Sequence, residues 1–72
     1  MANIEISGRN VPLDQITEVY SDSYGRFMAV VFGESDVEID AASLDEMIEL
    51  VPHIVEEKLI NERKEIRTMA AG

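Results

Sequence analysis

The sequence predicts one α+β domain: a small antiparallel sheet of three to four strands, followed by a C-terminal helix that is kinked or broken near Pro52. Three observations support this class. Short segments typical of strands, separated by glycine and turn residues, occupy positions 3–40. Apolar residues at helical spacing occupy positions 43–69. No repeat, linker or shift in composition divides the 72 residues, so we assign residues 1–72 to a single domain.

Four segments are interpreted as strands, within residues 3–7, 17–20, 26–32 and 36–40. Residues 9–16 are interpreted as a connection, because Pro12 lacks an N–H donor and forces its neighbour into an extended conformation. A single helical turn from Pro12 to Ile16 is an alternative for part of that connection. Residues 21–25 (SDSYG) have the composition of a tight reversal.

The C-terminal region is interpreted as helical. Ser43 and Glu46 match a capping box, which predicts a helix start at this position. Pro52 interrupts the apolar spacing, and an interior proline costs about 3 kcal/mol. The apolar stripe resumes in phase beyond it, so we expect either a kink or a short break.

The segment 26–32 is apolar on both faces, which is typical of a strand that is buried on two sides. Its own helix covers one face, and a 72-residue chain without cysteine has few other means of stabilisation. We therefore expect a homodimer, formed sheet to sheet or by exchange of the C-terminal helices. The alternative is a kinked helix that wraps both sides of one sheet. The expected oligomer interface comprises Met28, Val30, Phe32, Ile54, Leu59 and Ile66.

Negative charge is concentrated in one part of the chain. The net charge is −9, and residues 34–57 contain nine acids and no lysine or arginine, whereas residues 58–72 contain four bases and two acids. Such a chain repels nucleic acid and anionic membranes and attracts basic protein surfaces. The N-terminal MANIEIS lacks the features of a signal peptide, and no segment approaches the roughly 18 apolar residues of a membrane span. We expect a soluble, cytoplasmic protein that binds neither nucleic acid nor membrane.

Residues 34–41 (ESDVEIDA) place a carboxylate at every second position, which on a strand puts four acids on one face about 6.6–6.8 Å apart. The adjoining helix start would add three more acids. This surface, together with an exposed Tyr24 in the predicted turn, is our candidate for docking on a basic protein. Its residues are Glu34, Asp36, Glu38, Asp40, Asp45, Glu46, Glu49 and Tyr24. The alternative is a solvated face whose charges protect an edge strand from aggregation.

No metal site, cofactor or catalytic residue is expected. Carboxylates along a straight strand do not converge on one ion, and SDSYG does not match a calcium-binding loop. The chain has no cysteine nucleophile, no glycine-rich phosphate loop and no arrangement typical of a catalytic triad. The single histidine, His53, lies one helical turn from two glutamates, and it is either a pH-sensitive contact or an ordinary exposed hydrogen-bonding group.

No motif identifies a family. In size, absence of cysteine and concentrated negative charge, the chain resembles, at the level of general type, small phage-encoded inhibitors that occupy the nucleic-acid-binding surfaces of host proteins. That resemblance implies a viral protein that mimics nucleic acid. Our main hypothesis is a non-enzymatic, homodimeric interaction module that docks on a basic protein surface. The alternatives are an assembly protein whose role is its own oligomer, and a small-ligand binder or enzyme built across a dimer interface.

Overall fold

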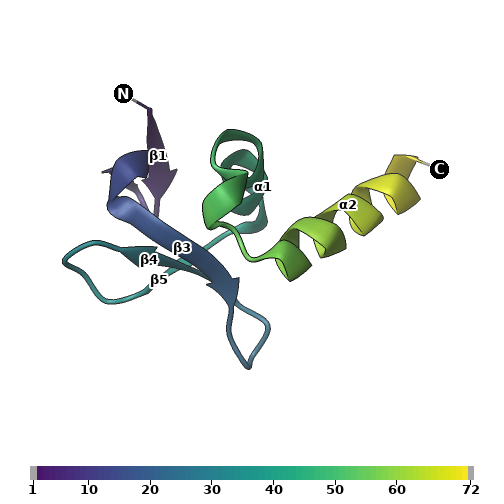
Figure 1. Cartoon of the computed structure of the whole chain (residues 1–72), viewed down its shortest axis with the longest axis horizontal. Coiled ribbons are helices and arrows are strands. Elements are labelled where there is room, and N and C mark those ends of the chain that lie inside the picture. Colours follow the sequence, from purple (N-terminus) through teal and green to yellow (C-terminus); the bar gives the residue numbers. More distant parts are fainter. Residues whose placement is uncertain (1, 72) are drawn as a thin grey trace.

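The computed structural model describes residues 2–71, apart from the side chains of residues 67 and 69–71. The chain forms two antiparallel sheets and two α-helices (Figure 1). This confirms the α+β class and the helix broken near Pro52. The order of elements is β1 (Asn3–Ile6), β2 (Arg9–Pro12), the 3-10 turn η1 (Leu13–Gln15), β3 (Ile16–Ser21), β4 (Phe27–Val31), β5 (Val37–Ile39), α1 (Ala41–Leu50), the 3-10 turn η2 (Pro52–Ile54) and α2 (Glu57–Ala71).

The N-terminal hairpin contains a strand that the sequence did not predict. β2 pairs with β1 through a two-residue turn at Ser7 and Gly8, both of which have positive φ angles. This is the backbone of the two-residue hairpin turn whose twist matches that of the strands. Pro12 is tolerated because it ends β2 on an edge strand, where its missing N–H breaks no central ladder. The interpretation of residues 9–16 as a connection was therefore wrong for its first half, whereas the predicted helical turn is present as η1.

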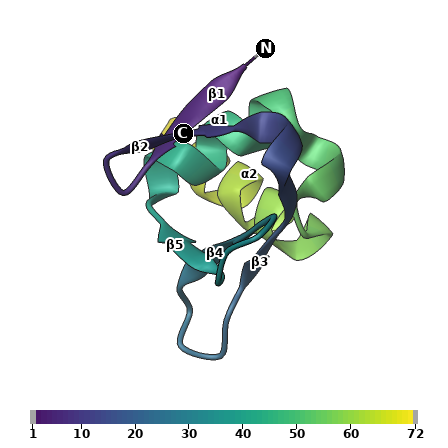
Figure 2. The same ribbon diagram turned by 90° about the vertical axis from the view of Figure 1, so that its left-hand side faces the viewer.

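β3, β4 and β5 form the second sheet, with β4 in the centre. The hairpin β1–β2 and the helix α1 lie on one side of this sheet (Figures 1 and 2). Alternation along β4 directs Ala29 and Val31 towards them, and both side chains are buried. We call this the inner face of the sheet and the opposite side the outer face.

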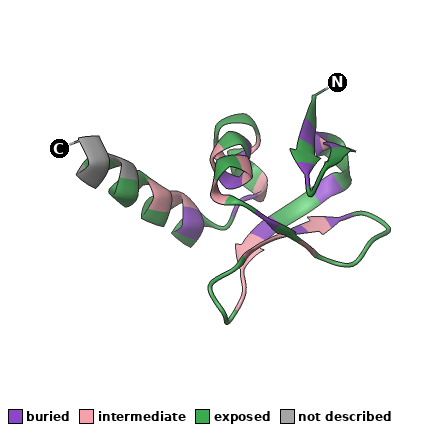
Figure 3. Ribbon diagram, turned by 180° about the vertical axis from the view of Figure 1, so that it is seen from behind, coloured by how far each residue is buried: buried purple, intermediate pink, exposed green. Residues whose placement is uncertain are grey.

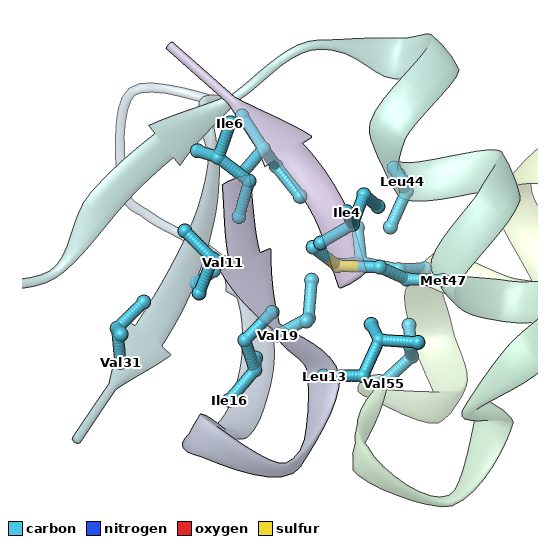
Figure 4. Packing of buried hydrophobic residues seen from close by; sticks show 13 residues of the cluster. Ile4, Ile6, Val11, Leu13, Ile16, Val19, Val31, Leu44, Met47 and Val55 are labelled. Carbon is cyan, nitrogen blue, oxygen red and sulfur yellow. The ribbon is translucent and has the colours of Figure 1, made fainter. Parts of the chain in front are cut away.

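The core lies between the inner face, the β1–β2 hairpin and the helices (Figures 3 and 4). Leu44 and Met47 of α1 and Leu59 of α2 are almost completely buried in it. Every buried side chain among the described residues is apolar. The core residues are Ile4, Ile6, Val11, Leu13, Ile16, Val19, Ala29, Val31, Ile39, Leu44, Met47, Val55 and Leu59.

The break at Pro52 separates two helices that point in different directions (Figure 1). After η2 the chain becomes extended, and Val55 forms an isolated parallel bridge with Val19 of β3. The Glu56 amide donates to the Val19 carbonyl over 2.9 Å. These contacts attach the linker to the edge of the sheet, and α2 then leaves the body of the protein.

α1 begins earlier than the sequence predicted. Its N-cap is Asp40, whose carboxylate accepts a hydrogen bond from the Ser43 amide over 2.8 Å. The capping box assigned to Ser43 and Glu46 was therefore wrong, because both residues lie inside the helix. As an N-cap, Asp40 satisfies the amide of Ser43, whereas the predicted box would have satisfied the amide of Glu46.

Candidate functional site

The outer face of the three-stranded sheet is an uncovered surface in which apolar and acidic side chains alternate. Met28 and Val30 of β4 point outwards and are half-buried. On the neighbouring strands, Tyr20 and Glu38 lie opposite Met28, and Glu18 lies opposite Val30. We call these five residues the outer sheet face. Glu18 and Glu38 are both exposed, and within the described part of the chain neither belongs to an ion pair, although the charge of Glu38 helps to raise the pKa of Arg26.

The β3–β4 turn at one end of this face has an ordered structure that exposes an aromatic ring. One carboxylate oxygen of Asp22 accepts hydrogen bonds from the amides of Tyr24 and Arg26, both over 2.9 Å. The other oxygen binds Arg26 Nε over 2.7 Å. These hydrogen bonds, led by the one from the Arg26 amide, lower the pKa of Asp22. Gly25 has a φ of 80°, which favours glycine.

As a result, the Tyr24 side chain is 83% exposed at the tip, and the Arg26 guanidinium lies 5.3 Å from its ring centre. This separation is within the range of a cation–π contact. The contact orients the ring and adds a positive charge beside it.

The β4–β5 turn at the other end exposes the second aromatic ring. Phe32 directly follows β4 and is 79% exposed, beside a hollow that is also lined by Arg9, Pro12 and Gln15. Its amide donates to the Gln15 carbonyl over 2.8 Å, so the backbone beneath the ring is held in place. Glu34 accepts two hydrogen bonds of 2.7 Å from Arg9, and this pairing lowers the pKa of Glu34. The pair fastens the turn to the β1–β2 hairpin.

The predicted row of four acids does not form a straight line. Glu38 lies within β5, whereas Glu34 and Asp36 lie in the preceding turn and Asp40 follows the strand. Asp36 accepts a hydrogen bond from the Tyr20 hydroxyl, which raises the pKa of Tyr20. The amide of Ser43 lowers the pKa of Asp40. Three of the four acids thus have intramolecular partners, and Glu38 carries the charge that faces outwards.

The acids predicted to join this row from the helix lie on a different side of the molecule. Asp45 forms two hydrogen bonds of 2.9 Å with Arg63, which join α1 to α2. Glu46 and Glu49 are exposed on α1, which packs on the inner side of the sheet. The expectation that strand and helix acids form one continuous patch is therefore corrected: the structure divides them between two surfaces.

The residues predicted for the oligomer interface are also divided. Met28 and Val30 belong to the outer sheet face, Phe32 is exposed in the turn after β4, and Ile66 is 51% exposed on α2. Leu59 is only 1% exposed, because its side chain completes the core of its own chain. Leu59 is thus not on the surface that a second copy would meet.

Ile54 lines a cleft that sequence reasoning missed. The cleft lies between η1 and the α1–η2 segment and has a volume of about 520 Å³. Its walls are mainly apolar, with Asp14 and His53 as the polar groups. Residues far apart in the sequence form it, and no local pattern indicates such a cleft. Its complete lining is Ala2, Leu13, Asp14, Ile16, Leu50, Val51, His53 and Ile54.

Among the described residues, no three His, Asp or Glu side chains lie where they would hold a metal ion. His53 is exposed near Pro52, at the edge of the cleft. Over residues 2–71, neither helix has the combination of length and apolar character that crossing a membrane requires.

The fold and the surfaces described above define a small α+β protein with an uncovered sheet face. Comparison of the chain with protein-family models, with curated proteins and with solved structures finds no match.

Proposed function

We propose that this protein is a non-enzymatic interaction module that binds a basic partner protein through its outer sheet face. The proposal rests on one observation. Half-buried apolar side chains and outward-facing carboxylates lie together on one uncovered surface. Met28 and Val30 supply the apolar contacts, and Glu18 and Glu38 supply the charge. Tyr24 and Phe32 are exposed in the turns at the two ends of the sheet.

The apolar part of the surface has the composition of an interface core. Aromatic residues and methionine are enriched at protein interfaces, and exposed tyrosines are frequent binding hot spots. The backbone of Tyr24 is held by its turn before any partner arrives, so less backbone freedom is lost on binding. The same reasoning applies to the backbone of Phe32.

The charges select the class of partner. Glu18 and Glu38 flank the apolar centre, and the whole chain carries a net charge of −9. Lysine and arginine on a partner would neutralise these carboxylates, whereas a phosphate backbone would be repelled. A second copy docked sheet to sheet would place like charges opposite one another. These arguments favour a basic protein over both nucleic acid and a face-to-face homodimer.

Surfaces that bind single-stranded nucleic acid combine lysine and arginine with exposed aromatic rings. We extend the proposal to such a surface as the docking target. The protein would then act as an inhibitor of the phage-encoded type, because it occupies the site that nucleic acid needs. It would imitate nucleic acid in the sign of its charge and in its flat rings, but not through regularly spaced charges.

The experiment compares two charge-reversed double variants that change the net charge equally. A partner is captured at low salt and identified, and its affinity is measured for the wild type, for E18K/E38K and for E46K/E49K. Reversal on the outer sheet face is expected to weaken binding by at least about tenfold, whereas reversal on α1 changes it less than about twofold. An oligonucleotide that the partner binds is expected to compete with the wild-type protein.

Equal losses for the two variants would contradict the proposal, because they would mean that net charge alone drives association. Unchanged binding by E18K/E38K would contradict it as well. The apolar contribution is measured separately with Met28→Ser at high salt, where exposed charges are screened within about 10 Å or less. Weaker binding by this variant is the expected result.

A further inference from the structure

The C-terminal part of α2 points away from the two sheets (Figure 1). The Arg63–Asp45 pair joins α2 to α1, and residues 64–71 continue the helix for roughly 12 Å beyond Arg63. We call residues 64–71 the α2 arm, and its ribbon projects away from the sheets in Figure 1. Ile66 lies two turns after Leu59 on the same face of the helix. Leu59 is buried, whereas Ile66 is 51% exposed. The apolar stripe of α2 therefore extends past the surface that covers it.

The cleft beside η2 is an apolar surface without an occupant from its own chain. Leu13, Ile16 and Ile54 contribute to its walls, and Leu50 leaves 51% of its side chain exposed there. Ile66 is not among the residues that line it. Only Val55 and Glu56 separate η2 from α2. The helix then points away from the sheets, and the α2 arm forms its far end (Figure 1).

The C-terminal helix and the border of the cleft carry charges of opposite sign. Residues 58–72 contain four bases and two acids. Asp14 lines the cleft, and an adjoining hollow that shares His53 and Ile54 contains Glu18 and Glu56. Asp14 forms no hydrogen bond or ion pair within residues 2–71. The basic helix and the acid-bordered cleft thus attract one another between copies, unlike two outer sheet faces.

We propose that two copies of this chain exchange their α2 arms, with Ile66 of each copy seated in the cleft formed by Leu13, Ile16, Leu50 and Ile54 of the other. A twofold axis relates the two contacts, because the same pair of surfaces is used in both directions. This interface uses neither Met28 nor Val30, so the outer sheet face of both copies stays open. The inference is independent of the proposed docking function, and it adds a second copy as a partner.

The test measures the mass of the full-length chain by sedimentation equilibrium over a range of concentrations. The wild type is expected to approach twice the 8.1 kDa of one chain. Leu50→Glu and Ile66→Glu each alter an exposed side chain, and each is expected to raise the dimer dissociation constant by roughly a hundredfold, because each substitution affects both symmetric contacts. Met28→Glu on the outer sheet face is the matched control, and its dimer is expected to persist.

Mixing the two variants provides the sharper result. One of the two contacts in a mixed dimer joins a native arm to a native cleft, so an equimolar mixture of L50E and I66E is expected to associate more tightly than either variant alone. Circular dichroism of each variant verifies that it is folded. A monomeric wild type would overturn the proposal. So would a dimer that Ile66→Glu disrupts but Leu50→Glu leaves intact, since that pattern indicates pairing between two arms.

Discussion

At the scale of single residues, the functions of the acids are decided by the donors that each one meets. Asp22 binds two amides and a guanidinium, Glu34 binds Arg9, and Glu38 makes no hydrogen bond. The first two maintain the turns at the ends of the outer sheet face, whereas Glu38 presents its charge to solvent. Residues of one chemical class thus divide between structural support and the candidate binding surface.

The Asp22 turn gives a prediction about pH. Because folding lowers the pKa of Asp22, its carboxylate stabilises the native state above the ordinary pKa of about 3.9. This contribution is lost as the pH falls through the lower folded value. Thermal unfolding should therefore show Asp22→Asn to be less stable than the wild type at pH 7, with the difference closing in strong acid.

Glu34 and Asp40 also lose stabilising contacts in acid. Both residues are present in the wild type and in Asp22→Asn, so their contributions cancel when the stabilities of these two proteins are compared. Glu18→Gln, which removes a carboxylate that has no hydrogen bond, controls for the loss of one negative charge. A difference between wild type and Asp22→Asn that is constant from neutral to strongly acidic pH would contradict the assignment.

At the scale of elements, the ends of helices and strands are set by caps and linkers. Asp40 ends the β5 segment and caps α1 in a single residue. Val55 and Glu56 end η2 by attaching the chain to β3. These junctions place α1 over the inner face of the sheet and send α2 away from the sheets (Figure 1).

The reassigned cap is testable by a pair of substitutions. Asp40→Ala removes the acceptor of the Ser43 amide and should lower Tm by roughly 4–8 °C. Glu46→Gln should change Tm little, although a capping box at Ser43 and Glu46 would require the opposite order. Thermal unfolding followed by circular dichroism measures the Tm of both variants. A larger decrease in Tm for Glu46→Gln than for Asp40→Ala would support the capping box at Ser43 and Glu46 instead.

At the scale of the whole molecule, one small core serves two sheets and two helices. A core of this size supplies a net stability of about 3–5 kcal/mol. Each completely buried side chain is therefore a large fraction of the total. Met28, Val30 and Ile66 lie outside this core, whereas Leu13 and Ile16, which line the cleft, belong to it. Surface substitutions usually change stability by less than about 0.5 kcal/mol.

Leu59 and Ile66 lie on the same face of α2, and the structure assigns them opposite effects on stability. Leu59→Ala should cost about 2–5 kcal/mol, because it opens a cavity in the core. Ile66→Ala should change the stability of the monomer by less than about 0.5 kcal/mol. Urea unfolding at concentrations below the dimer dissociation constant measures the two values. Similar costs for both variants would mean that the arm packs on its own chain.

Several features of this fold could be predicted from local sequence patterns. Alternation indicated β1 and β5, apolar residues on both faces indicated β4, and residues 17–20 were also interpreted as a strand, which is β3. The turn composition of residues 21–25 indicated the reversal before β4. Pro52 indicated the break between the helices. β2 was missed because Pro12 argues against a strand unless it lies at an edge, and its place at an edge depends on the pairing with β1.

The sequence by itself determined the α+β class, the apolar character of both faces of β4 and the concentration of negative charge, since these depend on residue type and on short-range spacing. The tertiary structure decided which acids are paired and which apolar residues are covered. Arg9 meets Glu34 across 25 positions, and Asp45 meets Arg63 across 18. Contacts at such separations arise only when the packed core brings the elements together, so the outer sheet face, the cleft and the α2 arm are properties of the folded chain.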